Sequence, residues 1–493
     1  MLTATHYLVS SALSILTFSI ILLWKVLKEK SQKNLSHQVS SFVIDGIKIY
    51  GKRSFSSIFQ LLSYTSLVLL ICSQLLNKLF LWQQIGAFFL GGISMSITLF
   101  ILTGLIPTFI PKIIEKSKGY LTNSLALQFN IVFMMGFMSI SILILIGTIL
   151  LETTSYTLLI GYSLGIIFSS FFTRIGGGLF KSCTQIGTSM SRTRNPSLPQ
   201  KDLRNPGHIT DISADYIHKL CGFCSDIIGS FILSILSMIL FAYAFEKHAL
   251  LPQNAIQLLK NIPLHILSIS FLGSIAGYIF SRYRIAKKEA KNALLEALYV
   301  ALLICAIGTY YLLSNINIDL PPSFWTGYKI FSPFIAYFAG LIGAALLCFT
   351  SEILTSSNFK AAKLCAKKME YGSACIYLFS IGHGLKNNAL YLLYLLGICI
   401  IAFYSAGLYG IAVASIAMLS LCSTIIAINS FSPLAKSVHQ IALLSTDSQT
   451  IHKHTKKMEY LGQSTIAIGN GFSSITSILS SLSLFFACTC LAN

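Results

Sequence analysis

The chain has 493 residues, of which 54% are hydrophobic and 10% are charged, and its mean hydropathy is +0.74. Soluble globular proteins carry about a quarter charged residues, so this composition excludes that class. The net charge of +19 could indicate a nucleic-acid-binding protein or a membrane protein. We expect an integral membrane protein, and the placement of the charges along the chain tests that expectation.

Apolar runs close to the roughly 20 residues that span the hydrocarbon of a bilayer recur along the whole chain. We count about twelve, at residues 6–27, 57–80, 83–109, 125–150, 156–180, 222–245, 262–281, 294–314, 330–355, 388–405, 408–433 and 464–491. They predict an all-α membrane bundle that forms a single domain over residues 1–493. The stretch 369–385 is predicted to add a short re-entrant or peripheral helix.

Basic residues gather in alternate connections, namely those after the odd-numbered predicted spans. Lys112, Lys116 and Lys118 follow the third span, for example, whereas the connections after even-numbered spans are short and nearly neutral. By the positive-inside rule, the basic connections face the cytoplasm and both termini face outward. This placement explains the charge without nucleic acid, and we expect the inner membrane of a bacterial cell as the location.

The longest polar stretch, residues 181–219, is interpreted as one cytoplasmic connection into which the fifth helix projects. The sixth helix is predicted to begin near Asp211. Just before this stretch, Gly176, Gly177 and Gly178 could cradle a phosphate, but glycines inside an apolar span more often allow close helix packing. Just after it, Cys221-Gly222-Phe223-Cys224 has no second cysteine pair at zinc spacing, so we interpret it as core packing rather than a metal or redox site.

Asp226 lies inside a predicted span, where a carboxylate is costly and is usually paired or lines a polar path. Arg174, at the end of the preceding span, is its natural partner. The alternative is that each side chain snorkels to the interface, which suits Arg174 better than Asp226. We therefore expect an ion pair between them, and we interpret Glu352 as an interfacial carboxylate.

Two ungapped segments carry a resemblance to a known family: residues 174–190, RIGGGLFKSCTQIGTSM, and residues 198–230, LPQKDLRNPGHITDISADYIHKLCGFCSDIIGS. They resemble the signature region of membrane-bound pyrophosphatases. Residues 407–420, GLYGIAVASIAMLS, and 458–472, MEYLGQSTIAIGNGF, are similar to that family's eleventh and twelfth helices. The chain is thereby identified as a member of this family over essentially its whole length.

The resemblance implies a bundle of sixteen helices that can form a homodimer. Its cytoplasmic extensions bind and hydrolyse magnesium pyrophosphate and couple this to proton or sodium movement. Such a polyanion needs several magnesium ions held by carboxylates, yet this chain has only 16 Asp plus Glu. The family positions for magnesium that remain are Asp211 and Asp215. Those for substrate are Asp202, Arg204 and Asn205, and those for the ion path are Arg174 and Asp226.

Many other functional positions of the family carry a different residue in this sequence. The replacements are Ser182, Gln185, Ser189, Thr193, Asn195, Gln200, Lys201, Ile212, Tyr216, Lys219, Gly229, Leu233, Asn429, Lys436 and Gln463. Lys219 and Lys436 place a cation where the family has an aspartate. Each could neutralise Asp211 or Asp215 in the space of a metal ion, or could contact a phosphate, and we favour the first interpretation.

Two hypotheses for the function remain. The chain could be an ion-translocating diphosphatase that works with a second polypeptide, because the family's last four helices are expected to be absent from this sequence. It could instead be a non-catalytic membrane protein that keeps the fold for assembly, regulation or passive transport. Loss of at least six ligands, each worth on the order of a few kcal/mol, favours a chain that is inactive alone. Magnesium is expected as a cofactor only if the site still works, and membrane lipid and, in an active protein, pyrophosphate are the expected partners.

Overall fold

A computed structural model describes residues 2–29, 35–75, 81–152, 156–194, 202, 205–248, 252–287, 293–313, 332–356 and 359–492. Within these ranges the chain is helical and contains no β-strand. The helices are α1 (Leu2–Lys28), α2 (Leu35–Leu75), α3 (Leu81–Leu105), η1 (Ile106–Phe109), α4 (Ile110–Lys116), α5 (Leu121–Glu152), α6 (Tyr156–Arg194), α7 (Pro206–Lys247), α8 (Gln253–Ala286), α9 (Ala293–Leu313), α10 (Pro333–Thr355), α11 (Lys360–Lys367), η2 (Lys368–Tyr371), α12 (Ser373–Leu419), α13 (Cys422–Ser445) and α14 (Gln449–Ala492). This architecture confirms the predicted all-α membrane bundle.

Eleven helices in the described part of the chain are long and apolar enough to cross a membrane. Twelve crossings were expected, and the difference lies in α12, which reverses direction at Ala406 and Gly407. Gly407 has a φ of 62°, which glycine adopts readily. A Cβ on Gly410 would lie 2.1 Å from the carbonyl oxygen of Ala402, although a straight helix would separate these residues by about 12 Å. The two arms of α12 therefore hold the tenth predicted span and the first part of the eleventh.

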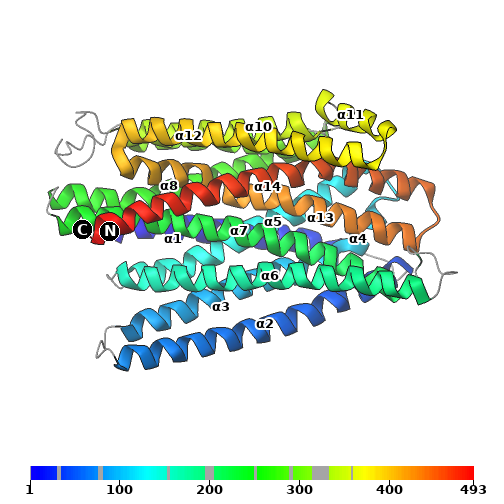
Figure 1. Cartoon of the computed structure of the whole chain (residues 1–493), viewed down its shortest axis with the longest axis horizontal. Helices are drawn as coiled ribbons and strands as arrows, with labels where there is room; N and C mark the ends of the chain where they lie inside the picture. The colour runs from blue at the N-terminus through cyan, green and yellow to red at the C-terminus, as the bar shows by residue number, and fades with distance from the viewer. Residues whose placement is uncertain are drawn as a thin grey trace.

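The two chain ends lie at the same end of the bundle (Figure 1). The side chain of Lys247, at the end of α7, donates a hydrogen bond of 2.8 Å to the carbonyl oxygen of Leu491 at the end of α14. Ends on the same side require an even number of crossings. The reversal in α12 supplies the twelfth, because its second arm continues through α13 toward the opposite end (Figure 1).

Helices α6 and α7 are much longer than a membrane crossing requires. They contain 39 and 42 residues, which correspond to about 58 and 63 Å, against a hydrocarbon thickness of about 30 Å. Both extend toward the bundle end opposite the termini, where α13 meets α14 (Figure 1). The predicted projection of the fifth span is therefore confirmed. The next helix begins at Pro206, earlier than the predicted start near Asp211, because Asn205 caps it.

The short element predicted over residues 369–385 differs from what the structure contains. Residues 360–367 form α11, residues 368–371 form a 3-10 turn, and from Ser373 onward the chain is already in α12. Gly372, with a φ of 97°, separates the turn from α12. The peripheral helix thus exists but lies earlier in the sequence, because the apolar pattern of 373–385 continues the long helix.

Helix-to-helix contact at glycines brings α6 against α3. A Cβ on Gly165 would lie 1.9 Å from the carbonyl oxygen of Phe88, and a Cβ on Gly161 would lie 2.4 Å from that of Gln84. Small residues four apart allow backbones to approach in membrane helices. This contact fixes α6 on one side, and α7 packs on α6, α13 and α14.

Candidate functional site at the extended ends of α6 and α7

The extended ends of α6 and α7 are joined by hydrogen bonds between polar side chains and backbone. The Thr188 hydroxyl on α6 donates to the Gly207 carbonyl oxygen on α7 at 3.0 Å. On its other side, α7 contacts α2, because the Ser213 hydroxyl donates to the Val43 carbonyl oxygen at 3.1 Å. These contacts fix the rotation of α7 and hence the direction in which its charged side chains point.

The two short motifs near this junction serve packing. Gly176, Gly177 and Gly178 lie within the continuous helix α6, where a Cβ on Gly177 would stand 3.5 Å from His218 Cα on α7. The helix-packing interpretation of these glycines is therefore confirmed. Cys221 and Cys224 are buried free thiols, and the described residues contain no group of three or more His, Cys, Asp or Glu that could hold a metal ion.

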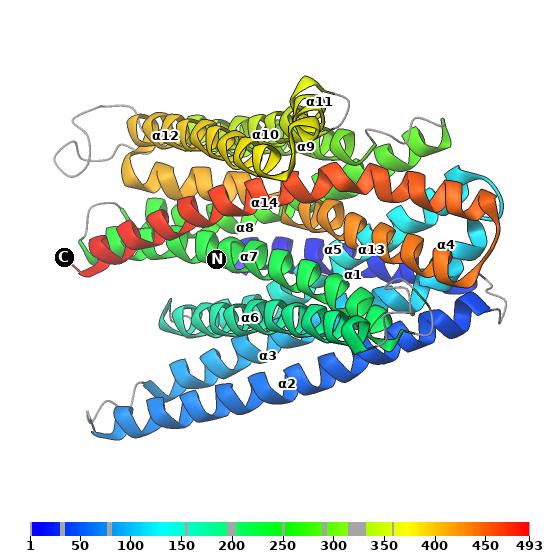
Figure 2. The same cartoon turned by 45° about the vertical axis from the view of Figure 1, so that its right-hand side comes forward.

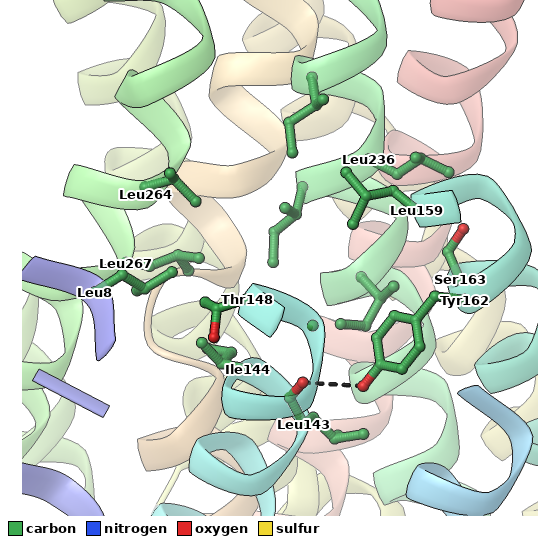
Figure 3. A pocket seen from close by; sticks show the side chains of 14 residues that line it. Leu8, Leu143, Ile144, Thr148, Leu159, Tyr162, Ser163, Leu236, Leu264 and Leu267 are labelled. Atoms are coloured by element: carbon green, nitrogen blue, oxygen red, sulfur yellow. Dashed lines mark hydrogen bonds between the residues drawn. The ribbon is translucent and has the colours of Figure 1, made fainter. Parts of the chain in front are cut away.

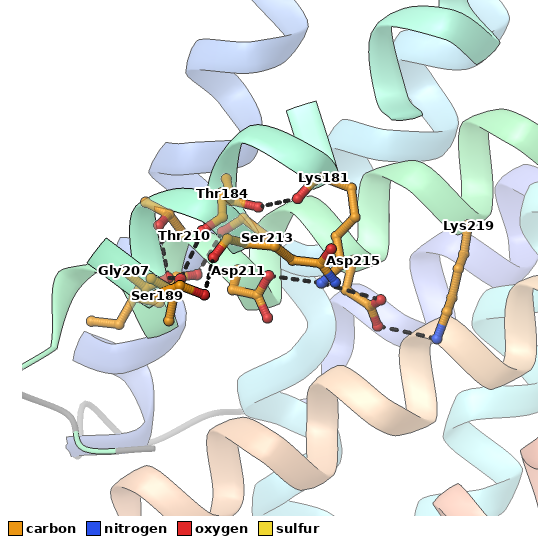
Figure 4. A network of polar contacts seen from close by, with 12 residues as sticks. Lys181, Thr184, Ser189, Gly207, Thr210, Asp211, Ser213, Asp215 and Lys219 are labelled. Atoms are coloured by element: carbon orange, nitrogen blue, oxygen red, sulfur yellow. Dashed lines mark hydrogen bonds and ion pairs between the residues drawn. The ribbon is translucent and has the colours of Figure 1, made fainter. Parts of the chain in front are cut away.

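A cluster of lysines and aspartates, Lys181, Asp211, Asp215, Lys219 and Lys436, lies where α6, α7 and α13 meet, and Figure 4 shows its α6 and α7 members. Lys181 Nζ lies 2.7 Å from Asp211 Oδ1 and 3.5 Å from Asp215 Oδ1. The other oxygen of Asp215, Oδ2, lies 3.1 Å from Lys219 Nζ and 2.8 Å from Lys436 Nζ. Three ammonium groups from three helices therefore surround one carboxylate. We call these five residues the lysine–aspartate cluster.

The lysine–aspartate cluster is mostly screened from solvent. The side chains of Lys181 and Asp215 are 13% and 14% exposed, so their charges interact in a medium less polarisable than water. Three lysines and two aspartates leave one net positive charge. Asp211, Asp215 and Lys219 follow one another at intervals of four residues on α7, so their side chains lie on one face of the helix.

The pairing predicted for the two replacement lysines is confirmed, because Lys219 and Lys436 both contact Asp215. Lys181 was missed by the sequence analysis. The resemblance directed attention to Ser182, the position that corresponds to a lysine in the family, whereas the neighbouring Lys181 reaches the two aspartates. The signal available in the sequence was a lysine in α6 facing the paired aspartates of the next helix, but it needs the register of the two helices to be interpreted.

Arg174 and Asp226 form the expected ion pair between α6 and α7. Asp226 is 22% exposed, whereas the Arg174 side chain is 60% exposed on the outer face of α6. Arg174 precedes Lys181 on α6, and Asp226 follows Lys219 on α7, in the apolar part of that helix. Gly229 and Leu233, the positions where the resemblance would place an acidic group, add no charge beside this pair.

The three residues assigned to substrate by resemblance have different surroundings. Asn205 is 1% exposed, and its side-chain oxygen accepts hydrogen bonds from Gly207 N at 3.0 Å and from the Ser191 hydroxyl at 3.3 Å. It therefore acts as the N-cap of α7. Asp202 is half-buried, and its carbonyl oxygen accepts from Asn205 N at 3.1 Å. Arg204 lies outside the described residues.

Asn429 occupies another position where the family has an aspartate. It is 6% exposed, and its amide nitrogen donates to the Ile425 carbonyl oxygen at 3.0 Å. Asn429 packs directly on Gly469 of α14, where a Cβ would fall 1.7 Å from the asparagine side-chain oxygen. The replacement of a carboxylate by an amide here is accommodated by close packing of α13 on α14, which removes one more anion from this end of the bundle.

An apolar cavity of about 50 Å³ lies among α1, α5, α6, α7 and α8 (Figure 3). Its wall is almost entirely aliphatic, and the hydroxyl of Tyr162 donates to the Leu143 carbonyl oxygen at 2.9 Å. Cavities of this kind stay dry. It therefore offers neither the charge nor the water that an ion or a phosphate would need, and the lysine–aspartate cluster remains the candidate site.

The central ion pair of the cluster predicts a strong energetic coupling. In a double-mutant cycle of Asp215→Asn and Lys436→Gln, we expect a coupling of about 2 kcal/mol, because the two charged groups lie 2.8 Å apart in a partly buried cluster. Unfolding in mixed detergent micelles measures it. The control cycle uses the half-exposed pair Glu29 and Lys116, 2.6 Å apart, for which we expect less than about 1 kcal/mol. Equal coupling in the two cycles would contradict the assignment.

Comparison with known proteins places this chain in a family. Residues 13–492 match the family described as inorganic H+ pyrophosphatase. The chain is 27% identical over 340 residues to a K(+)-stimulated pyrophosphate-energized sodium pump of Thermotoga maritima, an alignment that covers 66% of this chain and 46% of that protein. It is 24% identical over 489 residues to a K(+)-insensitive pyrophosphate-energized proton pump of Methanosarcina mazei, covering 95% of this chain and 68% of that protein.

A putative K(+)-stimulated pyrophosphate-energized sodium pump of Clostridium tetani is 26% identical over 66% of this chain and 46% of its own length. The alignments to the two sodium pumps thus span about half the length of those relatives. The family match, by contrast, covers nearly all of this chain and agrees with its all-helical membrane architecture. The chain therefore belongs to the inorganic H+ pyrophosphatase family.

Proposed function

We propose that this chain keeps the architecture of a pyrophosphate-energised ion pump but does not hydrolyse pyrophosphate by itself. The observation that carries the proposal is the contact of three lysines with the Asp215 carboxylate at 2.8 to 3.5 Å. Lysine cannot ligate a metal ion, and its ammonium group occupies the oxygens through which an aspartate would bind one. The site is therefore a remnant of a metal site in which lysines pair with the carboxylates.

Magnesium does not fit the residues present. Mg²⁺ demands an octahedron of oxygens at about 2.0–2.1 Å, and Asp211 and Asp215 are the two carboxylates that the cluster offers. Both already pair with Lys181, at 2.7 and 3.5 Å. A pyrophosphate ion that needs several magnesium ions would find too few anionic ligands here, so we assign no catalytic step to a metal in this chain.

A phosphate-release assay tests the absence of activity. Membranes that contain this chain should release no more phosphate from magnesium pyrophosphate than membranes without it, because the ligands of the metal are replaced. The Asp215→Asn variant is the matched control and should give the same background. Release by the unaltered chain that the Asp215→Asn variant lacks would contradict the proposal.

Restoring carboxylates tests whether the lysines are what excludes Mg²⁺ from the cluster. The melting temperature of the unaltered protein should not respond to Mg²⁺, whereas Lys219→Asp combined with Lys436→Asp should make it rise on Mg²⁺ addition. Binding at about 100 times the Kd contributes about 2.7 kcal/mol. The matched control changes the exposed Lys453 and Lys457 to Asp. Mg²⁺ stabilisation of the unaltered protein would show that the lysines do not exclude the metal.

A second candidate function is a pump assembled with another polypeptide. The exposed Arg174 side chain favours it, because a guanidinium in the apolar part of a bundle that faces lipid is costly and is normally covered by protein or water. Membrane helices from a partner would cover Arg174 and could bring further carboxylates to the cluster. In the phosphate-release assay, co-expression of a candidate partner separates the two functions, since only the assembled pump gives release that depends on Asp215.

We also propose that the chain lies in a bacterial inner membrane with both termini outside and the lysine–aspartate cluster in the cytoplasm. The same-side termini and the positive-inside rule support this orientation. The cluster would then meet the cytoplasmic pool of phosphate compounds. The opposite orientation would leave the basic connections on the outer side of the membrane.

The exposed thiol of Cys183 reports on the orientation. In intact cells a membrane-impermeant maleimide should leave Cys183 unlabelled, and it should label it after permeabilisation. The matched control is Ala492→Cys near the C-terminus, which should be labelled in intact cells. In both proteins the remaining exposed cysteines are first changed to serine, namely Cys72, Cys375 and Cys488. The reverse labelling pattern would overturn the orientation.

A further inference from the structure

The short helix α11 and the 3-10 turn that follows it stand outside the bundle, beyond α10 and α12 (Figures 1 and 2). Neither element contains a buried residue. A helix of eight residues is unstable in water on its own, because too few hydrogen bonds offset the entropy of nucleation. Contact with another surface would supply the missing stabilisation.

The side chains of this segment divide into a side that meets the protein and a side that does not. Ala361, Ala362 and Cys365 are half-buried toward α10 and α12. Lys360, Lys363 and Lys367 follow the helical spacing of one face, and all are exposed. The outward surface is therefore basic along its whole length.

Large apolar side chains accompany these lysines. Phe359 is 38% exposed, Leu364 49%, Met369 64% and Tyr371 69%. Lys368 places its ammonium 5.1 Å from the centre of the Tyr371 ring. Residues 359–371 hold four lysines and one acidic residue, Glu370, which gives the segment a charge of +3. Basic and apolar side chains side by side suit a membrane interface, where lysine stems cross the apolar boundary and the ammonium groups meet lipid headgroups.

The position of the segment also favours this partner. α11 begins five residues after α10 ends at Thr355, so it lies close to where a membrane-spanning helix leaves the bilayer. A cluster of lysines just outside a span is attracted to anionic lipid. We propose that α11 and the following turn, residues 359–371, form a binding surface for the anionic headgroups of the membrane that holds the protein.

Lipid selectivity at α11 tests the proposal. A fluorophore is attached to Leu364→Cys after the other reactive thiols are changed to serine, and the protein is placed in phosphatidylcholine nanodiscs. Two lipids are then titrated in separate experiments, phosphatidylglycerol and phosphatidylcholine, each with a quencher on its headgroup. We expect phosphatidylglycerol to reach half-maximal quenching at a mole fraction at least about fivefold lower, because even one lysine near an anionic surface favours binding by about that factor.

Charge variants identify the residues responsible. Changing Lys360, Lys363, Lys367 and Lys368 to Gln should remove the preference for phosphatidylglycerol. The matched control changes Lys453, Lys456 and Lys457 to Gln, exposed lysines at the start of α14, and should keep it. Equal quenching by the two lipids in the unaltered segment, or a preference that survives the four changes, would overturn the proposal. A fluorophore shielded from both lipids and from a soluble quencher would also overturn it, because protein would then cover α11.

Discussion

The site depends on one carboxylate, that of Asp215, and on the three ammonium groups that surround it. A partly buried aspartate with lysines from α6, α7 and α13 links three helices through a single charge. Taking such charges out of water is costly, and the cost is met only when each has a partner. The lysines therefore allow this end of the bundle to stay packed without the metal ions that a cluster of carboxylates would need.

This constraint connects the packing of the helices to the function we propose. The contacts that set the register of α7, from Thr188 and Ser213, also aim Asp211 and Asp215 at Lys181. Asn429 likewise has an amide in place of a carboxylate, and it packs directly on Gly469. The Arg174 and Asp226 pair survives nearby, although Gly229 and Leu233 bring no carboxylate beside it.

The bilayer made most of the fold predictable, because a span needs a long apolar run and the runs are visible in the sequence. The reversal of α12 could not be read in the same way, since both arms are apolar and only the φ of Gly407 separates them. The start of α7 lies five residues before the predicted Asp211, because Asn205 caps the helix and Pro206 begins it. Local patterns do not reveal which role a polar residue takes.

Some of the ion pairs could be predicted from the sequence and others could not. Arg174 with Asp226 and Lys219 with Asp215 could be predicted, because burial of a carboxylate demands a cation. Lys181 could not, since it depends on how α6 rotates against α7. The most direct measurement is an experimental structure with Mg²⁺ and a non-hydrolysable pyrophosphate analogue. We predict that Lys181, Lys219 and Lys436 contact the Asp215 carboxylate and that no metal ion lies between Asp211 and Asp215. Density for a metal ion that bridges the two aspartates, with Lys436 displaced, would contradict the account.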